Sequence, residues 1–208
     1  DDVDAVYIAT PPYFHPQHLE AAIDSGKHIY LEKPVAVDVP GCKNVMELGK
    51  KAGDKVSLAV GFQIRHASAY VALVERIHNG QIGKPVTGLI NYFASALRRE
   101  PTPDASPDER RLRNWVWDRA LSGDIIVEQN IHVIDVTNWV LDGHPVMASA
   151  QGGRAGRMDD GDCWSHFNAV YTYDNGVNIS FASTQFGTKA WGVAMQYSGS
   201  YGVAEARY

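Results

Sequence analysis

The 208-residue sequence has few cysteines and no long apolar run. Its two cysteines, Cys42 and Cys163, lie far apart and form no Cys-x-x-Cys pair, so we expect two unpaired thiols rather than a disulfide framework. No apolar stretch approaches the roughly 20 residues of a membrane-spanning helix, so we predict no such helix in this sequence. The chain shows no signal peptide and is assigned to the cytoplasm by default, although a segment before residue 1 could carry an export signal.

Positive charge is not in excess. The chain has 19 Lys and Arg against 24 Asp and Glu, a net charge of -5. This balance is not typical of a surface that binds nucleic acid or an anionic membrane, so we expect neither partner. Basic residues gather at 98–113, where they alternate with acidic residues, and we interpret that run as a solvated loop.

The first 62 residues alternate strand-like and helix-like segments. We predict strands at 3–9, 28–31 and 56–60, and helices at 15–25 and 39–51, the second capped by Asp38. Strands that are separated by helices pair in parallel through right-handed crossovers. The pattern therefore predicts an α/β region that forms half of a doubly wound sheet.

The pattern changes after residue 62. We predict a helix at 68–78, a strand at 85–96 and a helix at 126–141, then strand-like runs separated by turns at 159–162, 174–176 and 187–188. Asn175-Gly176 suits a tight hairpin turn with positive φ. Residues 63–208 are therefore predicted to be an α+β domain with a large, mostly antiparallel open sheet and helices on one face.

Two short motifs follow predicted parallel strands. Thr10-Pro11-Pro12 follows the first strand and Glu32-Lys33-Pro34 the second, at the edge where open α/β sheets bind ligands. There Lys33 can donate to a substrate hydroxyl or a cofactor amide. The alternative is a surface lysine beside prolines that only end strands. His15 lies near this edge, whereas we interpret His18 as a surface residue.

The predicted helix 126–141 carries a polar stripe. Glu128, His132 and Asp135 are spaced by four and then three residues, which places them on one face of an otherwise apolar helix. A buried helix of this kind needs partners or a ligand for its polar groups, and His132 can take a proton from a hydroxyl. The alternatives are an ion pair within the helix together with a satisfied core histidine, or a zinc site, which lacks a third ligand nearby; we predict no metal.

Three further residues are candidate substrate ligands. Arg65 follows the third strand and can meet an anionic or polyhydroxy ligand, or lie on the surface. Trp117 can stack on a sugar, or pack in a core between domains. His166 lies on a predicted strand that can face the same cavity.

The order and spacing of Ala9-Thr10-Pro11-Pro12, His15, Ala21–His28 and Glu32-Lys33-Pro34 closely resemble the glucose–fructose oxidoreductase/inositol dehydrogenase (Gfo/Idh/MocA) family. Gly61–Arg65 resembles the strand that closes that family's cofactor domain. Ser122-Gly123-Asp124, with the Glu128, His132 and Asp135 pattern, resembles its active-site helix. The resemblance runs through essentially the whole chain.

The resemblance implies a partial Rossmann (dinucleotide-binding) domain at 1–62 and a substrate-binding and oligomerisation domain at 63–208, incomplete at its C-terminus. It implies NAD or NADP as cofactor, a sugar or polyol as substrate, and a homo-oligomer formed through the C-terminal sheet. We expect Thr10, Pro11, Pro12, His15 and Glu32 to border the cofactor.

The resemblance also implies catalytic roles. Lys33 would bridge cofactor and substrate, and His132 would act as acid or base on the oxidised hydroxyl. Glu128 stands where an assisting aspartate is usual, and Asn130 stands where glycine is frequent, which adds a polar group near the substrate. We expect Lys33 and His132 to share one cleft.

One part of the family pattern is absent. No Gly-x-Gly-x-x-Gly precedes Asp1, so we expect a chain that begins within the cofactor domain, binds dinucleotide weakly by itself, and does not reveal NAD or NADP preference.

Three functions fit this sequence. The leading hypothesis is an NAD(P)-dependent dehydrogenase of a sugar or polyol. The second is glycoside cleavage by transient oxidation and elimination, which the departures at Glu128 and Asn130 keep open. The third is a non-catalytic ligand-binding or oligomerising module.

Overall fold

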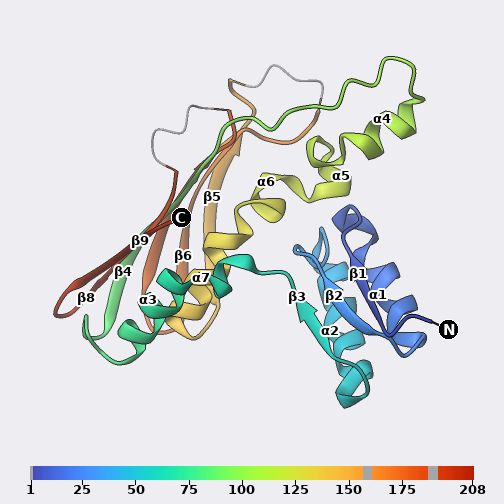
Figure 1. Cartoon of the computed structure of the whole chain (residues 1–208). Helices are drawn as coiled ribbons and strands as arrows, with labels where there is room; N and C mark the ends of the chain where they lie inside the picture. Colours follow the sequence, from blue (N-terminus) through green and yellow to red (C-terminus); the bar gives the residue numbers. More distant parts are fainter. Residues whose placement is uncertain (1, 157–160, 187–191) are drawn as a thin grey trace. The chain divides into compact units, whose positions relative to one another are not determined.

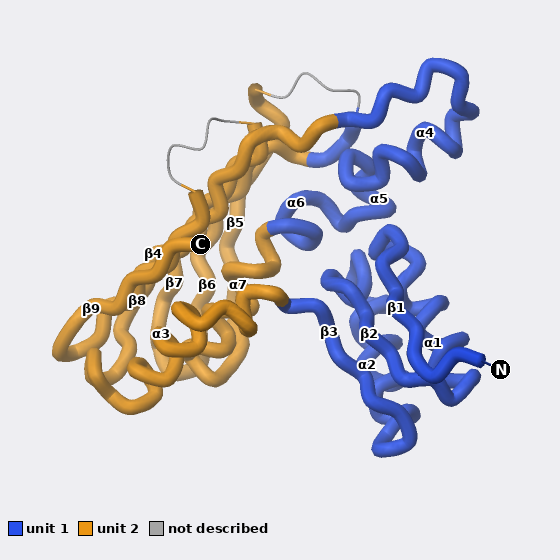
Figure 2. Tube along the Cα trace, in the orientation of Figure 1, with its two compact units in different colours: residues 1–62, 99–129, 160–163 blue, residues 63–98, 130–159, 164–208 orange. Residues whose placement is uncertain are grey.

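The computed structural model describes residues 2–156, 161–186 and 192–208 (Figure 1). The chain divides into two compact units (Figure 2). Unit 1 comprises Asp1–Phe62, Arg99–Gln129 and Asp160–Cys163, and unit 2 comprises Gln63–Arg98, Asn130–Asp159 and Trp164–Tyr208. The chain passes from unit 1 to unit 2 after Phe62, and later segments return to unit 1. The two-domain division of 1–62 and 63–208 stays a prediction.

Unit 1 contains a three-stranded parallel sheet of order β1-β2-β3. The strands are β1 (Ala5–Ile8), β2 (His28–Leu31) and β3 (Leu58–Val60), and the connecting elements are η1 (Pro12–Phe14), α1 (His15–Asp24), α2 (Val39–Ala52) and η2 (Gly53–Lys55). Asp38 caps α2 as expected, because its side chain accepts a hydrogen bond from the Gly41 amide at 2.8 Å.

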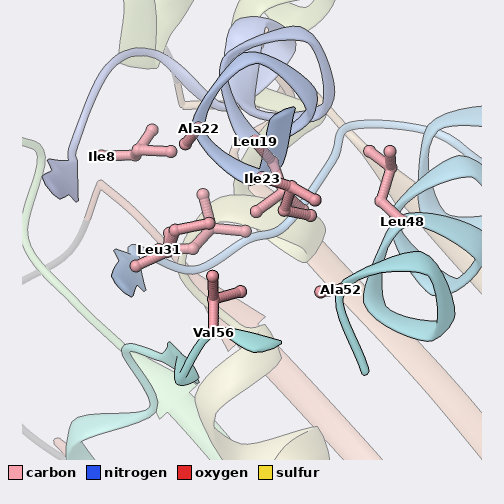
Figure 3. Packing of buried hydrophobic residues seen from close by; sticks show 9 residues of the cluster. Ile8, Leu19, Ala22, Ile23, Leu31, Leu48, Ala52 and Val56 are labelled. Atoms are coloured by element: carbon pink, nitrogen blue, oxygen red, sulfur yellow. The ribbon is translucent and has the colours of Figure 1, made fainter. Parts of the chain in front are cut away.

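The sheet is held to α1 and α2 by a small apolar core (Figure 3). Along β2, Ile29 and Leu31 are buried while His28 and Tyr30 are more exposed, the alternation expected of a strand with one covered face. The helices contribute apolar residues at helical spacing from one face each. The cluster consists of Ile8, Leu19, Ala22, Ile23, Ile29, Leu31, Leu48, Ala52 and Val56.

The expected solvated loop at 98–113 is wrong for its second half. Unit 1 continues with α4 (Pro107–Arg113), η4 (Trp115–Trp117), α5 (Arg119–Ser122) and α6 (Asp124–Glu128). Ser106 caps α4 by accepting a hydrogen bond from the Glu109 amide at 3.2 Å. The Ser-Pro-Asp-Glu sequence is a helix start signal, and the alternating charges concealed it.

The single helix expected at 126–141 is also wrong. The segment forms two helices, α6 and α7 (Ile131–Leu141), joined by Gln129 and Asn130. The Glu128 carbonyl oxygen accepts a hydrogen bond from Lys33, and helical bonding restarts from the Asn130 carbonyl, which accepts from Val133. Glu128 therefore does not share a helix with His132 and Asp135.

Unit 2 contains a six-stranded sheet of order β5-β6-β7-β4-β8-β9. The pair β4–β7 is parallel and the other neighbours are antiparallel, which confirms the mostly antiparallel sheet. The elements are η3 (Gln63–His66), α3 (Ser68–His78), β4 (Pro85–Phe93), α7, β5 (Pro145–Gly153), β6 (His166–Tyr173), β7 (Asn178–Thr184), β8 (Val193–Gly199) and β9 (Val203–Arg207).

The helices of unit 2 lie on one face of its sheet (Figure 1). Side chains of the central strands, such as Ile90 and Phe181, are buried there, and the Tyr197 and Thr137 hydroxyls hydrogen-bond at 2.9 Å between β8 and α7. Leu89 and Val170, at alternate positions, are exposed.

The Asn175-Gly176 turn joins β6 and β7 as predicted, with Gly176 at φ 83°. The turns expected at 159–162 and 187–188 fall wholly or partly outside the described residues. Within the described part of the chain, no helix has the length and apolar character needed to cross a membrane.

Replacing Leu31 by Ala tests the core of unit 1. Leu31 is 0% exposed within the cluster, so its truncation is expected to lower the free energy of unfolding by about 2 to 5 kcal/mol. Chemical denaturation measures this loss. Leu112→Ala on α4, where the side chain is 46% exposed, is the matched control and should change stability by less than about 0.5 kcal/mol. Equal effects of the two variants would contradict the assigned core.

Candidate active site

Lys33 follows β2 at the carboxyl edge of the parallel sheet. Its ammonium donates to the Glu128 carboxylate at 2.9 Å and also to the Glu128 backbone carbonyl. The two side chains are 13% and 15% exposed, so the pair is largely withdrawn from water. An ammonium has three donors, and Glu128 takes two of them. The alternative of Lys33 as a plain surface lysine does not fit this burial.

The end of α6 makes this double contact available. A residue inside a helix bonds its carbonyl to an amide four residues later, whereas Glu128 is the last residue of α6. Its carbonyl and carboxylate can therefore meet the same ammonium. Both residues belong to unit 1.

The remaining groups predicted for the cofactor edge lie in loops of unit 1. Thr10 and Pro11 follow β1, Pro12 opens η1, and Glu32 follows β2. The Glu32 carboxylate accepts a hydrogen bond from the Tyr7 hydroxyl, which raises the pKa of Tyr7 to about 12.

Gly61 allows the Glu32 side chain to lie over the end of β3. A Cβ at residue 61 would come within 2.7 Å of a Glu32 carboxylate oxygen and 3.1 Å of the Tyr30 hydroxyl. Tyr30 in turn stacks on Tyr7, with ring centroids 4.8 Å apart. No sequence motif indicates Tyr7 or Tyr30, because strand residues with exposed aromatic rings carry no distinct pattern.

His15 is 1% exposed and contacts two backbone carbonyls. Its Nδ1 lies 2.7 Å from the Pro34 carbonyl oxygen and its Nε2 lies 2.7 Å from that of Thr10. Burial lowers the pKa of His15 and outweighs the two carbonyls, which raise it. Both ring nitrogens already have partners within the protein, and cofactor binding by His15 stays a prediction.

His132 and Asn130 lie at the start of α7 in unit 2. His132 is 5% exposed, and Asn130, the N-cap residue, is 0% exposed. Neither amide atom of the Asn130 side chain has a hydrogen-bond partner among the described residues. Unsatisfied buried amides are costly, so this position is typical of one that receives water or a ligand.

Arg65 and Asp135 form a two-bond ion pair in unit 2. The Arg65 Nε and Nη2 atoms each lie 2.8 Å from a different Asp135 oxygen, and the guanidinium lies 5.3 Å from the centre of the Trp139 ring. The hydrogen bond to Asp135 raises the pKa of Arg65. Asp135 is therefore engaged away from the proposed acid–base chemistry, and Arg65 has a structural role beside its predicted role as a substrate ligand.

Trp117 and His166 fall in different units. Trp117 is 3% exposed, lies beneath the Arg99 guanidinium at 5.8 Å, and lines a depression of about 400 Å³ together with Arg110, Arg111 and Asn114. His166 begins β6, and its Nδ1 lies 3.1 Å from the Ser165 hydroxyl. Their roles as substrate ligands stay predictions.

The sequence pattern does not predict the backbone conformation of Asp124. It is 4% exposed and has φ 70°, a region that favours glycine. Its carboxylate accepts a hydrogen bond from the Ile125 amide at 2.7 Å, while its own amide donates to the Ser122 hydroxyl. Within the described ranges, no group of three or more His, Cys, Asp or Glu side chains could hold a metal ion.

The Arg65–Asp135 pair is open to a double-mutant cycle with Arg65→Met and Asp135→Asn. We expect a coupling free energy of about 1 kcal/mol, because the geometry uses two hydrogen bonds and Asp135 is only 13% exposed. The control is Lys50–Glu47 on α2, whose side chains are 68% and 70% exposed and should couple by less than about 0.5 kcal/mol. Chemical denaturation measures both cycles, and a coupling no larger than the control would refute the structural role.

His15 should titrate below its usual pKa of about 6.5. The unfolded chain then binds a proton more readily than the folded one. The stabilisation is therefore complete above the unfolded pKa of about 6.5 and is lost as pH falls below it through the lower folded pKa. NMR titration of the ring, assigned with His15→Asn, measures the shift. A pKa above the usual value would show that the carbonyl bonds outweigh burial.

Two family models match the chain in succession. Residues 1–61 match the Gfo/Idh/MocA oxidoreductase family with an NAD-binding Rossmann fold, and residues 70–205 match the GFO/IDH/MocA C-terminal domain.

Curated relatives and solved structures agree with these matches. A 1,5-anhydro-D-fructose reductase of Ensifer adhaerens is 30% identical over 77% of this chain and 44% of its own length. An inositol 2-dehydrogenase of Serratia proteamaculans is 33% identical over 68% of this chain and 36% of its own length. The chain thus spans less than half of these relatives.

The fold is shared with a myo-inositol 2-dehydrogenase structure from Lactobacillus plantarum, at a TM-score of 0.82 and 22% identity over 99% of this chain and 58% of that one. The resemblance inferred from the cofactor-edge motifs is confirmed. The chain belongs to the Gfo/Idh/MocA oxidoreductase family.

Proposed function

We propose that the protein containing this chain is an NAD(P)-dependent oxidoreductase that transfers a hydride between nicotinamide and a hydroxyl-bearing carbon of a sugar or polyol. The observation that carries the proposal is the Lys33 ammonium, which two Glu128 oxygens hold at the carboxyl edge of the parallel sheet. The names of the two curated relatives, a sugar reductase and an inositol dehydrogenase, support the substrate class.

The residues at this edge fit the nicotinamide end of a dinucleotide. The Glu32 carboxylate can accept from ribose hydroxyls. The carbonyls of Thr10, Pro11 and Pro12 each have one partner within unit 1 and keep a second lone pair for an amide. When bound, the nicotinamide supplies the acceptor or donor of the hydride. No Gly-x-Gly-x-x-Gly occurs in the sequence, so these residues account for one end of the cofactor and leave NAD against NADP open.

Each catalytic residue has a defined role in this proposal. Lys33 uses its third N–H to bind the reacting oxygen, while Glu128 fixes the ammonium and offsets its charge. His132 takes the proton of the hydroxyl during oxidation and returns it during reduction. The hydroxyl would lose its proton to His132 and its carbon would lose a hydride to a bound nicotinamide, which would leave a carbonyl group on the sugar and balance protons and electrons.

The substrate contacts and the assembly belong to the same proposal. Asn130 offers a donor and an acceptor, which match one sugar hydroxyl, and Arg65, Trp117 and His166 are further candidate ligands. We expect a homo-oligomer through the six-stranded sheet, supported by the exposed apolar side chains Leu89 and Val170 on it.

Kinetics on the complete reading frame that encodes this chain test the function. A panel of sugars and polyols with NAD or NADP should give a change in nicotinamide absorbance. Lys33→Met and His132→Asn should each lower kcat by roughly 10²- to 10⁴-fold, because each removes a group that binds or moves the proton. Glu128→Gln keeps the backbone acceptor and should cost less than Lys33→Met.

Lys55→Met is the matched control, since this lysine of unit 1 is exposed, and its kcat should be unchanged. No turnover with any substrate, or a fully active Lys33→Met variant, would refute the dehydrogenase. Release of an aglycone without accumulation of reduced cofactor would identify cleavage by oxidation and elimination instead. Calorimetric sugar binding without either reaction would identify a non-catalytic module.

A further inference from the structure

The first turn of α1 carries two histidines that both contact the loop after β1. His15 and His18 are three residues apart and lie on the same side of the helix. The His15 Nε2 atom lies 2.7 Å from the Thr10 carbonyl oxygen, and the His18 Nδ1 atom lies 2.9 Å from the Thr10 hydroxyl. Thr10 is therefore held at its backbone and at its side chain by one helix turn.

His15 also contacts a second loop. Its Nδ1 atom lies 2.7 Å from the carbonyl oxygen of Pro34, the residue after Lys33. The ring is 1% exposed, so water does not compete for either contact. Both facing groups are acceptors, so a neutral ring donates to one of the two carbonyls at a time and a protonated ring donates to both. It therefore stands between the segment that follows β1 and the segment that follows β2.

The backbone alone does not hold these two segments together. The pairing of β1 with β2 ends at Ile8 and Leu31, followed by a hydrogen bond from the Glu32 amide to the Ile8 carbonyl. Beyond that point, no strand pairing joins the two loops among the described residues. The ring does not cap its own helix either, because both of its nitrogens face carbonyl oxygens of the loops rather than backbone amides. Its contacts serve the loops.

We propose that His15 is a positioning residue that braces the Thr10–Pro12 loop against the Glu32–Pro34 loop and thereby fixes where the Lys33 ammonium is presented. The ring acts one residue away from Lys33, through the carbonyl of Pro34. The catalytic consequence rests on the proposed function of Lys33, whereas the brace itself rests on the contacts of unit 1 alone.

Two conservative variants separate the two contacts of the ring. The amide nitrogen of Asn lies near the position of Nδ1, so His15→Asn keeps the contact with Pro34. The longer Gln places its amide nitrogen near Nε2, so His15→Gln keeps the contact with Thr10. His15→Leu removes both.

Hydrogen exchange in the 208-residue chain tests the brace without any catalysis. The Phe14 amide, which donates to the Pro11 carbonyl, reports on the first loop, and the Glu32 amide reports on the second. His15→Leu should speed exchange at both amides by roughly tenfold. His15→Asn should affect mainly Phe14, and His15→Gln mainly Glu32. His144→Leu, at an exposed histidine, should change neither rate.

Kinetics of the complete protein test the positioning role. Loss of the brace should lower kcat by about 10- to 100-fold and leave the KM for the sugar nearly unchanged, because the ammonium is misplaced but not removed. In a Lys33→Met background, His15→Leu should have no further effect, because its effect passes through Lys33. The Asn and Gln variants should each recover part of kcat.

The outcomes separate this proposal from the proposed function. Unchanged exchange at both amides in a folded His15→Leu variant would overturn the brace, and so would an equal loss of kcat with and without Lys33. If His15→Leu is unfolded by circular dichroism, the Asn and Gln variants carry both tests. Identical exchange rates in these two variants would overturn the assignment of one ring contact to each loop. A wild-type protein without turnover would refute the dehydrogenase and leave the exchange result to decide the brace.

Discussion

The Lys33 ammonium and the Glu128 carboxylate are withdrawn from water together, at 13% and 15% exposure. Neither charge could lie there without the other, since an unpaired ion in such a setting is strongly destabilising. The pairing requires a strand that delivers Lys33 to the sheet edge and a helix that ends at Glu128 with its carbonyl exposed. The local folds of both segments thus serve one contact between residues 95 positions apart.

The parallel sheet and its two helices supply the rigid part of this arrangement. The apolar core of unit 1 fixes β1 and β2 in register, so the loops that follow them emerge side by side. Strand pairing ends at Ile8 and Leu31 and does not include the loop residues that follow. Polar side chains then determine the positions of these loops. Glu32 bonds to Tyr7, and His15 contacts both loops. Packing sets the position of the edge, and hydrogen bonds set the position of the groups on it.

The sequence predicted the regular elements well because their signals are local. The strand at 28–31 and the helix at 68–78 have the bounds seen in the structure, and Asp38 caps its helix. The parallel and antiparallel sheets followed from helix-length or turn-length connections. The family followed from spaced motifs that the comparisons confirm. These features depend on neighbours within a few residues.

The errors arose where a distant partner decides the local structure. Periodicity alone favours one helix across 126–141, but Lys33 takes the Glu128 carbonyl and the helix divides. Spacing places Asp135 on a polar stripe with Glu128 and His132, yet Arg65 from η3 binds it with two hydrogen bonds. The helix at 107–113 is a different kind of error, because its cap at Ser106 is a local signal that the alternating charges concealed. Sequence spacing cannot reveal the partners of Glu128 and Asp135, because both partners lie far away along the chain.

Departures from local rules are concentrated between Asp124 and Asn130. Asp124 adopts a φ of 70° without being glycine, the helix breaks after Glu128, and Asn130 is fully buried with an amide that has no partner among the described residues. Each departure costs stability, and single instances occur elsewhere, as at Asp142 (φ 49°) and at the buried Tyr70 hydroxyl. Strain and unsatisfied polar groups persist where another requirement overrides folding. The break after Glu128 lets this residue offer Lys33 two oxygens, which a continuous helix could not do.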